Sequence, residues 1–370
     1  MKHATVLALP GDPETVTGGY VYDRRIVAEL PRQGVDATIL RLPDDFPLPA
    51  HESLGRALDL LAAVPPDAVL MIDGLALAAL PPERLAGLGR PIVGLVHHPL
   101  ALETGLAPDV AARLAESERA ALAAVAEVVV TSPATAETLT RDFGVPAERV
   151  TVALPGTDRV PAARGAGGIP AILAVGSLIP RKGHDVLIGA LVALRDRAWT
   201  LTIVGGHDRD PACTARLLAL PAALGLAGRV RFLDAVDRAQ LAALYDGADI
   251  FALLSAYEGY GMAFAEALAA GLPIVACAGG AVPDTVPADA GILVPPGDGP
   301  AATAALASLL DDPALRRAKA TGARAAGLRL PGWEATAATV AEVVRRVAAS
   351  ASAASALPAS ARPAPPRLPL

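Results

Sequence analysis

The stretch Asp249-Ile-Phe-Ala-Leu-Leu-Ser255, followed closely by Glu258-Gly-Tyr-Gly-Met-Ala-Phe-Ala-Glu266, decides the fold. Its first part predicts a short buried strand, and Met262 to Ala270 predict a helix of good helix formers that Gly271 and Pro273 end. Glu258 therefore lies in a strand-to-helix loop, and Glu266 lies about one turn inside the helix.

Glu258 and Glu266 have two interpretations. The first is that both are solvated charges, as glutamates usually are. The second is a ligand site, and the sequence favours it. Glu266 lies in an apolar helix between two apolar strands, where an idle carboxylate would be costly to bury. We expect one glutamate to bind sugar hydroxyls and the other ribose hydroxyls of an extended ligand.

Composition limits the class of protein. The chain has 370 residues, of which 53% are apolar and 19% charged, so we expect two globular domains. A net charge of −6 gives no basic surface for nucleic acid. No uninterrupted apolar run reaches the roughly 18 residues of a membrane span, although peripheral membrane contact is left open. The chain begins directly with a predicted strand and no signal-peptide pattern, which predicts a cytoplasmic protein.

Short apolar strands alternate with helical stretches in both halves of the chain, which predicts an α/β protein with two doubly wound, Rossmann-like domains facing across a cleft. The predicted strands are Thr5 to Leu9, Ala37 to Leu42, Ala68 to Ile72, Ile92 to Val96 and Val128 to Thr131, then Ala171 to Gly176, Leu201 to Gly205, Val230 to Leu233, Ile250 to Leu254, Ile274 to Ala278 and Gly291 to Val294.

Glycine, proline and small residues between Pro155 and Pro170 predict the boundary between the domains. We therefore expect an N-terminal acceptor domain at 1–160 and a C-terminal donor domain at 161–332. The segment 333–349 predicts a helix that packs back on the first domain. The low-complexity segment 350–370 predicts a disordered tail.

Two loops have the composition of a phosphate site. Gly18-Gly19 opens the helix after the first strand, so its backbone amides can face an anion, although such a pair is often a simple turn. Arg181-Lys182-Gly183 follows the first strand of the second domain, where doubly wound domains bind ligands. Lys182 is one of only three lysines in the chain. A lysine beside an arginine can bind a pyrophosphate, and the alternative is an exposed basic turn.

His97-His98 ends a first-domain strand on the cleft side, where a lone histidine is more often structural, and an active-site histidine is the alternative that we carry forward. A metal would need further ligands at suitable spacing. Asp208-Arg-Asp210 resembles a metal-binding DxD motif but has the composition of a turn, and the two cysteines, Cys213 and Cys277, form no metal cluster. We therefore predict no metal and no cofactor.

In this order and spacing, Gly18-Gly19, His97, Arg181-Lys182-Gly183, Gly205-Gly206 and the Glu258 to Glu266 element resemble the retaining glycosyltransferases of family 4, which have the GT-B fold. The resemblance covers about residues 1 to 348, and its second half is the more specific. Tyr260 departs from the phenylalanine that is common there. Asp284 stands where glutamate is common.

The resemblance implies transfer of a sugar from a UDP- or GDP-linked donor to an acceptor hydroxyl with retention, without a metal. Glu266 would bind the ribose, Arg181 and Lys182 the pyrophosphate, and Glu258 the donor sugar, beside His97. These last four are the implied catalytic residues. The full implied donor site is Gly18, Gly19, Gly176, Arg181, Lys182, Gly205, Val236, Glu258, Gly259, Tyr260, Gly261, Met262 and Glu266.

The acceptor, whether lipid, glycan or small molecule, is not identified; candidate contacts are His98, Leu100, Glu103 and Thr104. Three alternatives stay open on the sequence. A sugar-nucleotide epimerase or a glycan phosphorylase could share the architecture. The third is a non-catalytic protein that binds a nucleotide sugar.

Overall fold

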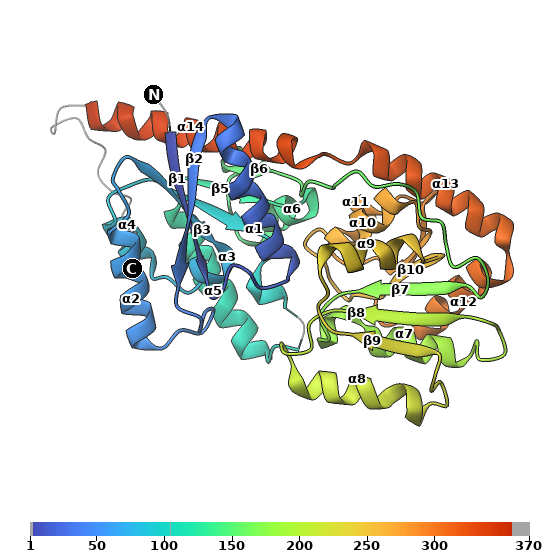
Figure 1. Ribbon diagram of the computed structural model, residues 1–370. Coiled ribbons are helices and arrows are strands. Elements are labelled where there is room, and N and C mark those ends of the chain that lie inside the picture. The colour runs from blue at the N-terminus through green and yellow to red at the C-terminus, as the bar shows by residue number, and fades with distance from the viewer. Residues whose placement is uncertain (1–2, 104, 357–370) are drawn as a thin grey trace.

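The computed structural model, which describes residues 3–103 and 105–356, contains two six-stranded sheets with helices on both faces (Figure 1). The strand orders are β2-β1-β3-β4-β5-β6 and β12-β11-β10-β7-β8-β9. All neighbouring strands pair in parallel. These findings confirm the predicted pair of doubly wound domains.

The strands of the first sheet are β1 (His3–Pro10), β2 (Val35–Leu42), β3 (Ala68–Asp73), β4 (Ile92–Val96), β5 (Glu127–Val130) and β6 (Val150–Val152). Those of the second are β7 (Ala171–Val175), β8 (Thr200–Val204), β9 (Val230–Leu233), β10 (Ile250–Leu253), β11 (Ile274–Cys277) and β12 (Gly291–Val294). Strands β3, β4, β10 and β11 are buried along their whole length, as expected of parallel strands covered on both faces.

The helices of the first half are α1 (Gly18–Glu29), α2 (His51–Ala62), α3 (Gly74–Leu77), α4 (Pro82–Gly87), α5 (Pro108–Ala124) and α6 (Pro133–Asp142). Those that follow are α7 (His184–Val192), α8 (Pro211–Ala223), α9 (Arg238–Asp246), α10 (Met262–Ala270), α11 (Val282–Thr285), α12 (Gly299–Asp311), α13 (Pro313–Arg329) and α14 (Trp333–Ala356). Short 3₁₀ turns are η1 (Leu30–Gln33), η2 (Leu100–Leu102), η3 (Ala147–Arg149) and η4 (Pro180–Lys182).

Each sheet divides its half into two hydrophobic cores because successive side chains of a strand point to opposite faces. In β1, Leu7 and Leu9 belong to the core beneath α1, whereas Ala8 belongs to the core on the other face. In β7, Leu173 faces one core while Ile172 and Ala174 face the other.

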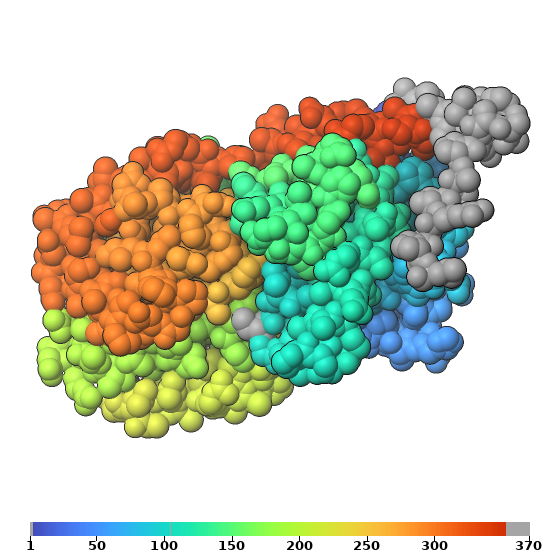
Figure 2. Space-filling model, turned by 180° about the vertical axis from the view of Figure 1, so that it is seen from behind, coloured from blue at the N-terminus to red at the C-terminus, as the bar shows by residue number. Residues whose placement is uncertain are grey.

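Helix α14 packs on the first sheet although it follows the second in sequence. Val340, Val343 and Val344 are fully buried in one core with Leu7, Leu9 and other residues of the first sheet. Seen from behind, the C-terminal helices run along one edge of both lobes (Figure 2).

Two details differ from the sequence predictions. The first sheet has a sixth strand, β6, whose three half-buried residues are too few to give a sequence pattern. Helix α14 continues to Ala356, so residues 350–356 are helical instead of belonging to a disordered tail. Alanine favours helix, and Ser350 and Ser352 donate to the carbonyls of Arg346 and Ala348. Residues 357–370 lie outside the described chain.

Within 3–103 and 105–356, no helix has the length and apolar character to cross a bilayer.

The linker has no room for a side chain at position 156, where it passes the start of α14. A Cβ there would lie 2.4 Å from the backbone nitrogen of Trp333. Gly156→Ala should therefore lower the free energy of unfolding by about 1–3 kcal/mol, measured by denaturant titration. Gly55→Ala is the control, because a Cβ at this position of α2 meets open space and alanine favours helix. Equal stability of the two variants would contradict this packing.

Candidate functional site

The strand order of each sheet reverses once. The polar residues selected from the sequence gather near these two reversals. In the first sheet the reversal lies between β1 and β3, and in the second it lies between β7 and β10. Loops that leave adjacent parallel strands on opposite sides open a crevice at the carboxyl edge. Gly18-Gly19, Asp73 and His97 lie at this edge of the first sheet. Arg181, Lys182 and Glu258 lie at that of the second.

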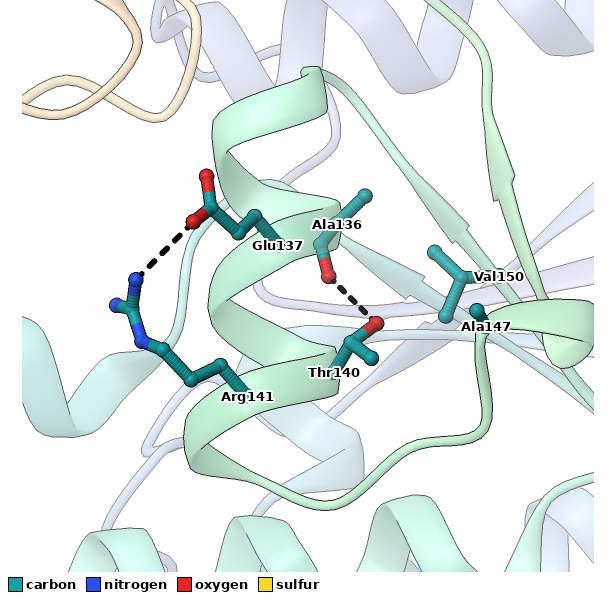
Figure 3. Close-up of a pocket in the computed structure, with 6 residues that line it drawn as sticks. All are labelled: Ala136, Glu137, Thr140, Arg141, Ala147 and Val150. Carbon is teal, nitrogen blue, oxygen red and sulfur yellow. Dashed lines mark hydrogen bonds and ion pairs between the residues drawn. The ribbon is translucent and has the colours of Figure 1, made fainter.

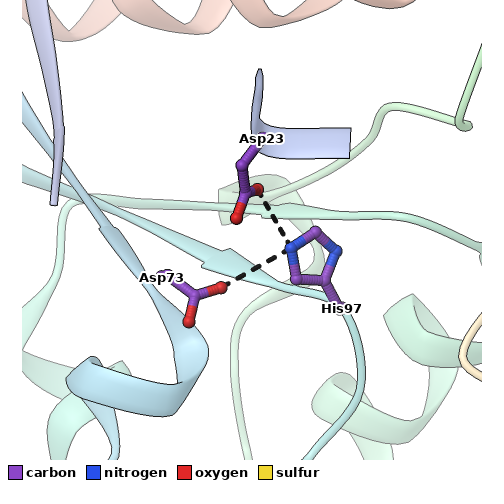
Figure 4. Close-up of side chains that lie close together, drawn as sticks. All are labelled: Asp23, Asp73 and His97. Carbon is purple, nitrogen blue, oxygen red and sulfur yellow. Dashed lines mark hydrogen bonds and ion pairs between the residues drawn. The ribbon is translucent and has the colours of Figure 1, made fainter. Parts of the chain in front are cut away.

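His97 forms a cluster with two aspartates that the sequence analysis did not select (Figure 4). Its Nε2 lies 3.1 Å from Oδ1 of Asp23 in α1 and 3.5 Å from Oδ2 of Asp73 at the end of β3. Burial, reinforced by the charge of Asp23, raises the pKa of Asp73 to about 7. Burial lowers the pKa of His97, but the charges of both aspartates and the hydrogen bond to Asp23 outweigh it, so that this pKa is raised. One nitrogen and two carboxylate oxygens, atom types that can bind a metal ion, converge here. An imidazole that shares protons with two carboxylates explains the same geometry without a metal ion.

Gly19 lies against this histidine. A Cβ at position 19 would be 3.2 Å from Cδ2 and 3.4 Å from Nε2 of His97, closer than most Cβ contacts. A Cβ at Gly18 would be 3.7 Å from Sδ of Met262, at the start of α10 in the second half. The glycine pair therefore allows α1 to approach both the histidine and the opposite half.

Arg181 and Lys182 form the turn η4 between β7 and α7, and their cations converge on Glu258. Lys182 Nζ lies 2.6 Å from Glu258 Oε1, and Arg181 Nη1 lies 3.4 Å from Oε2. Arg181 Nη1 also donates to the carbonyl of Tyr257 at 2.9 Å. Burial raises the pKa of Glu258, but the two cations outweigh it and hold this pKa below its usual value. The alternative of an exposed basic turn is therefore wrong.

Residues of the two halves meet at this cluster. Arg181 Nε donates to Oε1 of Glu103, in the loop after β4, at 2.8 Å. The other oxygen, Oε2, lies 3.4 Å from Nε2 of His98. A Cβ at Gly259 would be 2.1 Å from the carbonyl oxygen of His97, so the loop that carries Glu258 touches the end of β4. Thr135 Oγ1, on α6, donates to the carbonyl of Gly259 at 3.3 Å.

Glu266 lies inside α10, away from the basic turn. Its Oε2 accepts a hydrogen bond from the hydroxyl of Tyr245 at 2.8 Å. Burial raises the pKa of this glutamate, and the nearby Asp158 adds to the effect. Asp158 lies in the linker, where Arg25 Nη2 of α1 and Arg238 Nη2 of α9 lie 2.8 Å and 2.5 Å from its carboxylate.

The remaining predicted residues have structural contacts. A Cβ at Gly205 would lie 2.0 Å from the carbonyl oxygen of Gly176, and one at Gly176 would touch the Lys182 side chain. Val236 packs against the core beneath α10, and the main-chain carbonyl of Tyr260 accepts from Thr285. Gly261 precedes Met262 at the start of α10. Thr104 lies outside the described residues.

His184 is another residue that the sequence analysis missed. This buried side chain begins α7, and its Nε2 lies 3.1 Å from the carbonyl oxygen of Gly176. Burial lowers its pKa to about 4, so the neutral ring holds the loop after β7. Its position directly after Arg181-Lys182-Gly183 was the available sequence signal. By contrast, Asp210 caps α8 by accepting from the amide of Cys213 at 2.8 Å, which confirms that the DxD segment forms a turn.

A shallow hollow of about 300 Å³ lies on the first half, between α6 and β6 (Figure 3). Its wall includes the exposed pair Arg141 and Glu137, 3.2 Å apart, and Thr140, which donates to the carbonyl of Ala136. None of its lining residues belongs to the two charged clusters, so its size alone does not identify a site.

Similarity to known proteins identifies the family of this chain. Residues 169–312 match the family described as Glycosyl transferases group 1, and residues 38–160 match Glycosyltransferase Family 4. The MMP alpha-(1->4)-mannosyltransferase of Mycolicibacterium hassiacum is 31% identical over 288 residues, covering 72% of this chain and 69% of that protein. The chain therefore belongs to the group 1 glycosyltransferases of family 4.

One further relative and two solved structures show how much of the chain is similar to known glycosyltransferases and to known folds. A D-inositol 3-phosphate glycosyltransferase of Xylanimonas cellulosilytica is 35% identical over 261 residues, covering 66% of this chain but only 62% of that protein. Sucrose-phosphate synthase from Thermosynechococcus elongatus has a TM-score of 0.80 at 24% identity, covering 94% of this chain and all of that chain. Anabaena HepE, in complex with UDP and glucose, has a TM-score of 0.76 at 17% identity, covering 93% and 100%. These two structures establish the GT-B fold.

Glu118 of α5 holds the loop that carries Glu103. Its buried carboxylate accepts from the amides of Leu100 at 2.6 Å and Ala101 at 2.9 Å, at the start of η2. Burial raises its pKa from 4.5 to about 7, although both amides oppose the change. The native protein therefore binds more protons than the unfolded chain between these two pH values.

We expect the protonated carboxyl of Glu118 to contribute to the free energy of unfolding. This contribution is fully present below pH 4.5 and is lost as pH rises through about 7, a change on the order of 3 kcal/mol. Glu118→Gln removes the titration. The difference in unfolding free energy between the native protein and Glu118→Gln should fall over this range, measured by denaturant titration at several pH values. A difference that does not vary with pH would show that Glu118 does not titrate in this way.

Proposed function

We propose that the protein transfers a glycosyl group from a nucleoside-diphosphate sugar to an acceptor hydroxyl, with retention at the anomeric carbon. The observation that carries the proposal is the pair Arg181 and Lys182, which face Glu258 at one carboxyl edge and stand opposite His97 at the other. Two fixed cations suit a diphosphate. The relatives point to the donor class: one is named as dependent on GDP-mannose, and HepE is in complex with UDP-glucose.

The proposed chemistry rests on charge. As the glycosidic bond to phosphate breaks, positive charge grows on the sugar and negative charge on the departing diphosphate. Arg181, Lys182 and the backbone amides of Gly18 and Gly19 at the start of α1 stabilise the diphosphate most in the transition state, which is what accelerates the step. These groups supply the stabilisation without a metal. A phosphate oxygen accepts the proton of the acceptor hydroxyl on the same face, which gives retention.

The two glutamates have different surroundings and therefore different proposed roles. Glu258 is ion-paired with Lys182, which lowers its nucleophilicity, so it orients the sugar instead of attacking it. Glu266, with Tyr245 as its hydrogen-bond partner, accepts the ribose hydroxyls. His97 faces the transferred sugar. His98 and the loop from Leu100 to Glu103 contribute to the acceptor side.

The location of the protein in the cytoplasm stays a prediction.

One observation weighs against the phosphorylase alternative. A phosphorylase of this architecture would need a lysine to hold pyridoxal phosphate. Lys319 Nζ instead donates to the backbone carbonyls of Ala288 at 2.5 Å and Gly291 at 3.2 Å, outside the clusters described above. An epimerase would convert the nucleotide sugar with no acceptor present, and a binding protein would leave it unchanged.

Thermal unfolding with UDP, GDP, ADP and their sugar conjugates tests the donor site. A nucleotide at about 100 times its dissociation constant should stabilise the native protein by roughly 2.7 kcal/mol. Glu266→Ala should lose most of this gain, whereas Glu137→Ala, an exposed glutamate of α6, should keep it. If no nucleotide stabilises the native protein at millimolar concentration, the assignment of the donor site is wrong. Where one does, NMR of the product with candidate acceptors gives the anomeric configuration.

Glu103 competes with the diphosphate for Arg181 in this proposal. We expect Glu103→Gln to tighten binding of the preferred nucleoside diphosphate by about three- to tenfold, equivalent to roughly 0.7–1.4 kcal/mol. Calorimetry of Glu103→Gln, Arg181→Ala and the double variant forms the test. The gain should vanish in the Arg181→Ala background because the two side chains act on the same ligand. Weaker binding by Glu103→Gln alone would mean that Glu103 orients Arg181 instead of competing with the ligand.

A further inference from the structure

Three polar side chains from separate elements meet behind the proposed sugar site. Asp23 comes from the second turn of α1, Asp73 from the end of β3, and His97 from the end of β4. The side chains of Asp23 and Asp73 are only 1% and 3% exposed, whereas that of His97 is 21% exposed. The imidazole is therefore the part of this cluster that reaches a ligand, and the carboxylates act through it.

Both carboxylates approach the same ring nitrogen. At 3.1 Å and 3.5 Å from two acidic oxygens, Nε2 is placed to donate a proton to a carboxylate, because a lone pair there would face the negative charge of Asp23. The other nitrogen, Nδ1, points away from both aspartates (Figure 4). A proton on Nε2 thus leaves Nδ1 as the atom that contacts a ligand.

The surroundings fix the ring in this orientation. Tyr22 packs edge-on against the imidazole, with ring centroids 5.3 Å apart and planes at 80°. A side chain at position 19 would press on the Cδ2–Nε2 edge of the ring, so α1 lies close to this edge. Turning the ring over would place a carbon between the two carboxylates and lose both polar contacts. The aspartates therefore determine both the protonation and the direction of the ring.

We propose that Asp23 and Asp73 are positioning residues that hold His97 as an Nε2-protonated, charged imidazole whose Nδ1–H donates to a hydroxyl of the transferred sugar. The ligand class follows from the charge of the whole cluster. Two carboxylates and one imidazolium carry a net charge of −1, and a proton on Asp73 makes the cluster neutral. Such a cluster suits a neutral hydroxyl better than a phosphate, whose charge Arg181 and Lys182 match. This inference rests on the proposed function for the identity of the ligand, but the state of His97 does not depend on it.

The pKa directions agree with this arrangement. The charged groups that face His97 are Asp23 from α1 and Asp73 from β3, and both raise its pKa against the effect of burial. Tyr22, the aromatic neighbour, has a pKa raised by its own burial and stays neutral near pH 7. No cation among the described residues forms an ion pair with either aspartate other than His97.

NMR titration of the histidine rings tests the proposal without a substrate. The chain has six histidines, and His97→Gln identifies the signal of His97. We expect a pKa above the ordinary value of about 6.5, with the proton of the neutral form on Nε2. Asp23→Asn should lower this pKa by about one unit, and Asp73→Asn should lower it less. An asparagine can cap α3 as Asp73 does, so the fold of the Asp73→Asn variant should persist. Asp59→Asn, an exposed position of α2, is the control that leaves the signal unchanged.

Binding of nucleotides to the same variants separates the two proposals. Asp23→Asn should bind the free nucleoside diphosphate as the native protein does, but should lose about three- to tenfold in affinity for the sugar conjugate. A His97 signal that titrates at or below about 6.5, or that Asp23→Asn does not move, overturns the inference even if nucleotides bind. Equal loss for the diphosphate and its sugar conjugate also overturns it. Absence of nucleotide binding by the native protein contradicts the proposed function, while the titration still decides the state of His97.

Discussion

Parallel strand pairing places both charged clusters of this protein. A parallel strand must return through a helix on one face of the sheet, so all the loops at one end of the strands gather at the carboxyl edge. Each sheet reverses its order once, between β1 and β3 and between β7 and β10, and the emerging loops diverge there. The aspartates and His97 occupy one such point, and Arg181, Lys182 and Glu258 occupy the other. The contact of Gly259 with the carbonyl of His97 brings the two points together.

Buried charge at these points is balanced locally. Glu258 forms ion pairs with Arg181 and Lys182. Arg181 also pairs with Glu103, and His97 lies beside the carboxylates of Asp23 and Asp73. Ion pairs taken out of water rarely add stability, because desolvation offsets their attraction. Their presence at a carboxyl edge is therefore better explained by function than by stability. The protein's own acidic groups pair with Arg181 and Lys182, the cations proposed to bind a diphosphate, and these ion pairs hold both side chains in place.

The sequence predicted most of the fold because the signals were local. The bounds of α10, Met262–Ala270, were predicted correctly from helix formers ended by glycine and proline, and all but one of the twelve strands were found. Arg181, Lys182 and Glu258 could be selected because each follows an apolar strand. Asp23 and Asp73 could not. Their partner His97 is 74 residues from Asp23 along the chain, and no local pattern shows that α1, β3 and β4 meet. Glu103 was selected as a possible acceptor contact, but its ion pair with Arg181 depends on how the two halves sit together.

Helix α14 has a consequence for synthesis of the protein on the ribosome. The apolar face of the first sheet is covered by Trp333 and the valines that follow it, so it lacks part of its cover until nearly the whole chain has been made. About 180 residues separate the end of the first sheet at Val152 from Trp333, and at roughly 5–20 residues per second their translation takes about 10–40 s. During that interval the core around Leu7 and Leu9 lacks the part that Trp333 and the valines of α14 complete. The halves are thus separate in sequence but not in biogenesis, because the first can be completed only after the second has been synthesised.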